Sequence, residues 1–108
     1  LAFLLDEAER FDEAEGAFRR AVALDPQLDR AWYGLGLVLI GQQRYDEAVA
    51  ALKRNTELQP MSPYGWYQLA RVQVDRQQPD EARKIIRHLK GFEPKVADQL
   101  VRETGLDP

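Results

Sequence analysis

The sequence predicts an all-α protein in which antiparallel helix pairs stack side by side. Two observations support this prediction. The triplet Asp-Glu-Ala occurs three times in 108 residues, each time 34 residues after the last. Between the triplets, apolar residues recur with the 3.6-residue period of a helix rather than the two-residue period of a strand. A fixed repeat of this length is typical of arrays in which each unit buries its apolar face against its neighbours.

The repeat extends well beyond the triplet. Agreement at many further positions shows that the sequence is periodic as a whole, so the triplet is no chance event. The positions that keep the 34-residue step include Leu24, Leu58 and Phe92; Pro26, Pro60 and Pro94; Phe11 and Tyr45; and Trp32 and Trp66.

The middle unit shows the helix pair most clearly. Apolar or small residues recur at i, i+3, i+4 and i+7 from Trp32 to Leu39, which places them on one stripe of a first helix. The pattern loosens over residues 41–44, where we expect a turn. A second helix is predicted from Tyr45 to about Leu58, because a proline follows at position 60 and cannot continue the helical hydrogen bonds.

This pattern gives the triplet a physical role. Its two acids fall in the first turn of each predicted second helix, where free amides and the positive end of the helix dipole favour carboxylates. Its alanine is small, like Gly36 and Ala70 on the first helices. Small side chains at these positions allow two helices to approach closely.

The middle unit resembles a known family. The spacing Trp32-x2-Leu35-Gly36, followed by Ala48 and Pro60, is similar to the tetratricopeptide repeat, a 34-residue pair of helices. The resemblance covers residues 1 to about 94 and implies a right-handed α-solenoid. It implies one domain over 1–108, with a partial repeat at 1–28, complete repeats at 29–62 and 63–96, and a capping helix at 95–105.

Several residues depart from the family pattern. Asn55 stands where the family usually has alanine, which places a polar group at a helix contact. Pro79 replaces the aromatic residue of the earlier units, although proline suits the first position of a helix. The phase breaks at Glu103 and Thr104, so the last helix is predicted to cap the array, and Gly105 to end it.

Bulk composition narrows the class of partner. The net charge of −3 and the pI near 5.2 disfavour nucleic acid and anionic membranes as partners. The longest uncharged run, residues 31–43, is too short for a membrane span, which needs about 20 apolar residues. The chain has no cysteine, which fixes no compartment, although we favour a cytoplasmic one. It opens with Leu1 in an apolar run, and we expect it to be a piece of a longer protein.

A second strip of side chains runs beside the predicted core stripe. The first helix of the middle unit, residues 31–41, carries no charge, which is unusual for a helix with one face in water. Counting about 100° per residue from Trp32, the strip at roughly 80° to 140° holds Tyr33, Leu37 and Ile40. The matching strip holds Tyr64, Tyr67, Arg71 and Val74 in the next unit, and Phe3 and Asp6 in the first.

The resemblance implies that this strip lines a concave groove that holds a peptide or helix of another protein. Tyrosine and arginine, which are frequent here, are the side chains that most often dominate binding energy at interfaces. The alternative for Leu37 and Ile40 is packing against neighbouring helices. The candidate partner-binding residues are Arg30, Tyr33, Leu37, Ile40, Tyr64, Tyr67, Gln68 and Arg71.

An alternative function is a structural spacer or a self-association module within a larger protein. Residues 1–29 carry three bases and eight acids, a net charge of −5, whereas residues 30–108 carry twelve bases and ten acids, a net charge of +2. Opposite charges of this kind could favour contacts between the ends of two copies, weakened by salt.

The residue inventory gives little support to enzyme chemistry. The chain has one histidine, one serine and no cysteine, from which no nucleophile and base can be assembled. His88 is interpreted as a surface residue. The acids between Glu9 and Glu15 lack the glycine-containing loop of a calcium site, and no glycine motif for phosphate occurs. We therefore expect no enzyme activity, no metal and no cofactor.

Overall fold

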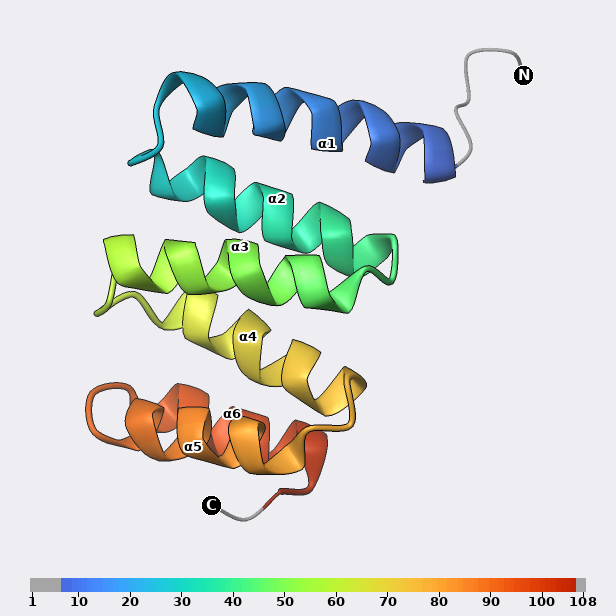
Figure 1. Ribbon diagram of the computed structural model, residues 1–108. Helices are drawn as coiled ribbons and strands as arrows, with labels where there is room; N and C mark the ends of the chain where they lie inside the picture. The colour runs from blue at the N-terminus through green and yellow to red at the C-terminus, as the bar shows by residue number, and fades with distance from the viewer. Residues whose placement is uncertain (1–6, 107–108) are drawn as a thin grey trace.

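The computed structural model describes residues 7–106, and these residues form six α-helices (Figure 1). No strand occurs among them, which confirms the predicted all-α class. The helices are α1 (Glu7–Leu24), α2 (Asp29–Gly41), α3 (Tyr45–Leu58), α4 (Pro63–Asp75), α5 (Pro79–Lys90) and α6 (Pro94–Thr104).

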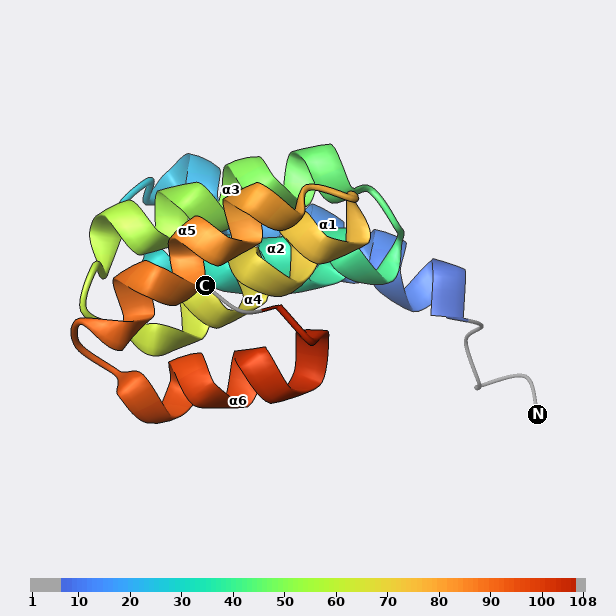
Figure 2. The same cartoon turned by 90° about the horizontal axis from the view of Figure 1, so that it is seen from below.

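The helices stack in chain order as antiparallel neighbours. Each contacts the helix before it and the helix after it, and there are further contacts of α2 with α4 and of α4 with α6. Figure 1 shows α1 to α5 lying side by side, with α6 behind α5. Seen from below (Figure 2), α1, α3 and α5 form an outer layer and α2, α4 and α6 an inner one. This is the two-layer arrangement of a helical solenoid.

The core lies between the two layers and is built from aliphatic side chains of five helices. The small residues predicted at close helix contacts are buried: Ala48, Ala70 and Ala82 have no exposed surface. A Cβ added at Gly36 would lie 2.7 Å from Leu52, so α2 and α3 can pack this closely only around a glycine. The largest fully buried side chains are Leu39, Leu52, Val72, Ile86, Leu89 and Leu100.

The two turns between the helices of a complete repeat share one backbone feature. Gln43 and Gln77 lie 34 residues apart and both adopt left-handed backbone conformations, with φ values of 60° and 61°. Glycine adopts this region freely, whereas a residue with a Cβ does so at a cost of about 1–2 kcal/mol. Helix α6 instead ends at Gly105, whose φ is 73°.

The first helix differs from the prediction. In α3 and α5 the two acids of the triplet lie in the first turn, as expected. In α1 they do not, because the helix already begins at Glu7 and the triplet starts at Asp12. The residues at the position of the turn, 7–10, read Glu-Ala-Glu-Arg, which are strong helix formers, whereas the matching segment of the middle unit begins with Gly41.

The two tryptophans also depart from the expectation of full burial. Trp32 and Trp66 pack against the core but remain partly exposed. The indole N–H of Trp32 donates to the Pro26 carbonyl at 2.8 Å, and that of Trp66 donates to the Pro60 carbonyl at 2.9 Å. An indole has one polar atom that needs a partner, and here the partner lies at the protein surface.

Candidate partner-binding surface

A depression on the inner layer collects side chains from three helices. It has a volume of about 230 Å³ and opens between α2, α4 and α6. Four of the eight predicted binding residues meet there: Tyr33 from α2, and Tyr64, Tyr67 and Gln68 from α4. The remaining lining residues are Pro63, Val96 and Gln99.

Helix geometry explains why these side chains converge. Tyr64, Tyr67 and Gln68 stand at i, i+3 and i+4 on α4, and therefore share one face of that helix. Tyr33 occupies the same position in its repeat as Tyr67, 34 residues earlier, so it points to the same side of the stack from α2. Tyr64 is 69% exposed, which leaves most of its ring available to a ligand.

A second depression adjoins the first near the start of α2. Arg30, an exposed residue, lines it together with Tyr33 and Tyr64. Because Tyr33 and Tyr64 line both depressions, the two are continuous, and we call them together the tyrosine groove. The other lining residues of the second depression are Asp29, Asn55 and Ser62.

Three predicted residues do not line the tyrosine groove. Leu37 is 37% exposed on α2, while Ile40 packs against the core, as the alternative interpretation of this residue anticipated. Arg71 lies one turn beyond Tyr67 on α4. Phe3 and Asp6, the matching positions of the first unit, lie outside the described residues.

Arg71 and Tyr67 are both bound to Glu103 of α6. The Tyr67 hydroxyl donates to the Glu103 carboxylate, and the Arg71 guanidinium lies 2.9 Å from the same oxygen. Arg71 also donates to the Tyr67 hydroxyl at 3.1 Å and lies 5.9 Å from the centre of its ring. The hydrogen bond from Tyr67 is the main cause that lowers the pKa of Glu103 below its ordinary value, and Gln99 and Arg71 add to it.

Sequence reasoning missed the contribution of α6 to this surface. Glu103 was noticed only as a break in the repeat, and Gln99 only as a polar residue on the outside of a capping helix. The missing information is tertiary: α6 lies against α4 as well as α5, which brings Val96, Gln99 and Glu103 to the groove. No local pattern in the sequence gives this position.

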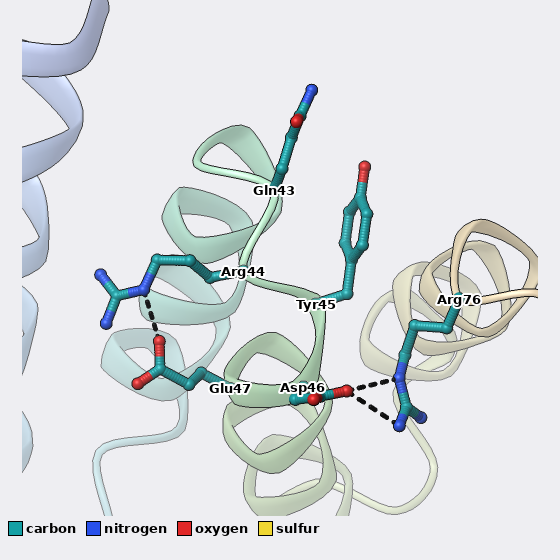
Figure 3. A pocket seen from close by; sticks show the side chains of 6 residues that line it. All are labelled: Gln43, Arg44, Tyr45, Asp46, Glu47 and Arg76. Carbon is teal, nitrogen blue, oxygen red and sulfur yellow. Dashed lines mark hydrogen bonds and ion pairs between the residues drawn. The ribbon is translucent and has the colours of Figure 1, made fainter.

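A charged cluster at the turns joins neighbouring repeats (Figure 3). Asp46 and Arg76 point toward one another there, and both Nε and Nη2 of Arg76 lie 2.9 Å from the Asp46 carboxylate. One repeat earlier, the Gln42 amide donates to the Asp12 carboxylate at 3.2 Å. The aspartate of the triplet thus accepts a hydrogen bond from the next repeat, a role that the sequence analysis did not foresee.

The same cluster has little capacity to bind a charged ligand, because its charges neutralise each other. Arg44 lies 2.6 Å from Glu15 of α1 and also pairs with Glu47. A hydrogen bond from Arg19 is the largest cause of the lowered pKa of Glu15, with further hydrogen bonds from Gln42 and Arg44. We interpret this cluster as a structural contact between units.

The residues considered for chemistry lie apart from one another. His88 is exposed on α5 and stacks between Trp66 and Phe92, with ring centres 4.5 Å and 5.2 Å away. Within residues 7–106, no three or more histidine and acidic side chains are grouped closely enough to hold a metal ion. None of the six helices described combines the length and the apolar character of a membrane-spanning segment.

Comparison with known proteins settles the family. A family model described as tetratricopeptide repeat matches residues 1–63 and again residues 41–91. The chain belongs to the tetratricopeptide-repeat family. Among curated proteins, none matches this tetratricopeptide-repeat chain. Tetratricopeptide repeats generally mediate protein–protein interactions, and members of the family typically serve as scaffolds and not as enzymes.

Proposed function

We propose that this chain binds a peptide or helix of a partner protein in the tyrosine groove. The observation that carries the proposal is the meeting of Tyr33, Tyr64 and Tyr67 from two successive repeats in one depression. Tyrosines combine a large apolar ring with a directed hydroxyl, and are enriched where interfaces bind most strongly.

The size of the depression favours a macromolecular ligand over a small molecule. Its volume of about 230 Å³ lies below the roughly 300–1,000 Å³ of a typical small-molecule pocket. A space of this size accommodates side chains of a ligand that extends beyond it. The adjoining depression next to Arg30 continues the surface in the direction of the first repeat.

The eight predicted residues take different roles in this proposal. The three tyrosines make the central contacts, and Gln68 and Arg30 flank them. Leu37 offers an exposed apolar contact next to the groove, whereas Ile40 supports the packing of α2. Arg71 acts as a positioning residue, because its guanidinium is bound to Glu103 and Tyr67.

The test is a selection of peptides by the protein itself. A random peptide library is panned against the wild-type domain, and the dissociation constant of a selected peptide is measured for wild type, Tyr33→Ala and Tyr64→Ala. Removing a central interface tyrosine typically costs about 2 kcal/mol, so we expect a loss of affinity of about thirtyfold in each variant. Circular dichroism confirms that the variants stay helical.

The matched control lies on the outer layer. Arg83→Ala/Arg87→Ala changes α5 away from the groove and should leave the dissociation constant within about twofold of wild type, as expected of surface residues outside an interface. A selected peptide that loses affinity in this control, while binding both tyrosine variants normally, would place the binding surface elsewhere and contradict the proposal.

Self-association is a second candidate function, favoured by the partly exposed face of α1. Positions that are buried in α3 and α5 are only partly covered in α1. Ala14 and Phe18 are half-buried, while the matching Leu52 and Ile86 have no exposed surface. A second copy could cover this face. Sedimentation equilibrium tests it: Ala14→Glu should remove a dimer present in wild type, and a wild-type monomer at all concentrations would contradict it.

A further inference from the structure

Uncharged side chains alone line the depression between α2, α4 and α6. This is unusual in a chain in which 31% of residues are charged. An uncharged lining complements an uncharged ligand, since a charged group placed there would lose hydration without gaining a counter-charge. The seven lining residues are Tyr33, Pro63, Tyr64, Tyr67, Gln68, Val96 and Gln99.

We infer that the ligand of the tyrosine groove is a proline-rich segment in the polyproline II conformation. This inference rests on the proposed function and states which kind of peptide the groove selects. Grooves lined by aromatic rings are a recurring way to recognise polyproline II, because the ligand is already extended and loses little entropy on binding.

The polar groups of the groove fit the backbone of such a segment. Polyproline II has no internal hydrogen bonds, so its carbonyl groups accept hydrogen bonds from a partner. Tyr33, Gln68 and Gln99 carry hydroxyl or amide groups that can donate. Gln99 donates one N–H to Glu103 at 2.9 Å, and its amide has a second N–H. An α-helical ligand has its own carbonyls already bonded and gains nothing from these donors.

The spacing of the repeats also matches the period of this conformation. Tyr33 and Tyr67 occupy the same repeat position on α2 and α4, two helices in contact. The axes of helices in contact lie about 8–10 Å apart. Polyproline II advances about 3.1 Å per residue with three residues per turn, or about 9.3 Å per turn. Every third residue of a ligand that crosses the helices can therefore meet an equivalent tyrosine.

One of these rings is fixed in place before any ligand binds. Tyr67 donates its hydroxyl to Glu103, and Arg71 lies 5.9 Å from the centre of the ring. A ring held from two sides loses less freedom when a proline packs on it, which favours affinity. Tyr64 provides the exposed ring on the opposite side of the same depression.

The experiment compares two probe peptides of equal length by isothermal titration calorimetry. One is an oligoproline with acetylated and amidated ends, and the other is an alanine-rich helical peptide with the same ends. We expect the oligoproline to bind and the helical peptide to bind at least tenfold more weakly. Tyr64→Ala and Tyr33→Ala should each weaken oligoproline binding about tenfold or more, while Arg83→Ala/Arg87→Ala should not change it.

The outcomes separate this inference from the proposed function. If the helical peptide or a library-selected peptide without proline binds through Tyr33 and Tyr64 while the oligoproline does not, the polyproline inference is wrong and the peptide-binding groove stands. Oligoproline binding that is unchanged in both tyrosine variants would also overturn the inference. If library panning yields no peptide that depends on these tyrosines, the proposed function itself fails.

Discussion

Asn55 of α3 lies directly against Gly65 of α4, at the junction between the two complete repeats. A Cβ added at Gly65 would overlap the Asn55 side-chain oxygen. The Asn55 amide nitrogen donates to the Asp29 carbonyl at 2.9 Å, which satisfies a side chain that is only 5% exposed. One repeat earlier the matching positions are both alanine, at 21 and 31. The polar departure at 55 is thus accommodated by the loss of a side chain at 65.

This pair predicts a strong coupling between two mutations. Gly65→Ala alone should lower the free energy of unfolding by about 1–3 kcal/mol, because the added methyl overpacks the helix contact. Asn55→Ala alone should cost about 1 kcal/mol, because the Asp29 carbonyl loses its donor. The double variant restores the alanine pair of the preceding repeat and should be more stable than the sum of the single changes by about 1 kcal/mol or more. Urea denaturation measures all three.

Gly16→Ala serves as the control for adding a methyl to a helix. Gly16 lies within α1, and an added Cβ would meet only the end of the flexible Arg20 side chain at 3.4 Å. Alanine in a helix interior is favoured over glycine by about 0.5–1 kcal/mol, so this variant should be more stable than wild type. Additive losses at positions 55 and 65 would show that the two side chains do not interact.

The sequence predicted the parts of the fold that depend on local pattern. The helix pairs, the turn at 41–44, the start of α5 at Pro79 and the close contact at Gly36 all follow from periodicity, proline chemistry and residue size. The tyrosine strip followed from the same periodicity. Contacts between distant segments did not follow, because Glu103, Gly65 and Arg76 take their roles from neighbours about ten to thirty-six residues away. Such pairings have no local signature.

The left-handed glutamines of the turns predict a stabilising mutation. Gln77→Gly removes the steric cost of a Cβ at φ 61° and should raise the free energy of unfolding by about 1 kcal/mol. Gln43→Gly, one repeat earlier, should act in the same way. Gln78→Gly is the control: its φ is −116°, so glycine only adds freedom to the unfolded chain and should destabilise. Equal effects at 77 and 78 would contradict the strain at the turn.

The cluster around Glu103 predicts a dependence of stability on pH. Tyr67, Gln99 and Arg71 lower the pKa of Glu103, so the ionised carboxylate stabilises the folded state at neutral pH. That contribution is present above the ordinary glutamate pKa of about 4.3 and is lost as the pH falls through the lowered value. Wild type should therefore be more stable than Glu103→Gln at pH 7, and the difference should shrink below about pH 4. A difference that stays constant across this range would exclude the ionised contact.

The tryptophans predict two separable losses in thermal unfolding followed by circular dichroism. Trp66→Phe keeps a large ring but removes the hydrogen bond to the Pro60 carbonyl, which should cost about 1 kcal/mol. Trp66→Ala also removes the contacts with the core and His88, and should cost about 3 kcal/mol, the lower end of the range for buried aromatics because the ring is partly exposed. Equal melting temperatures for wild type and Trp66→Ala would mean that the ring contributes no packing.

Nuclear magnetic resonance tests the central claim most directly. The 15N-labelled domain is titrated with a peptide selected from the library, and shifts of the backbone amide signals are mapped onto the helices. Binding in the tyrosine groove predicts the largest shifts around Tyr33, Tyr64 and Tyr67, with smaller shifts near Gln99 on α6, since these residues line one depression. Shifts confined to the outer helices α1, α3 and α5, with the three tyrosines unchanged, would contradict it.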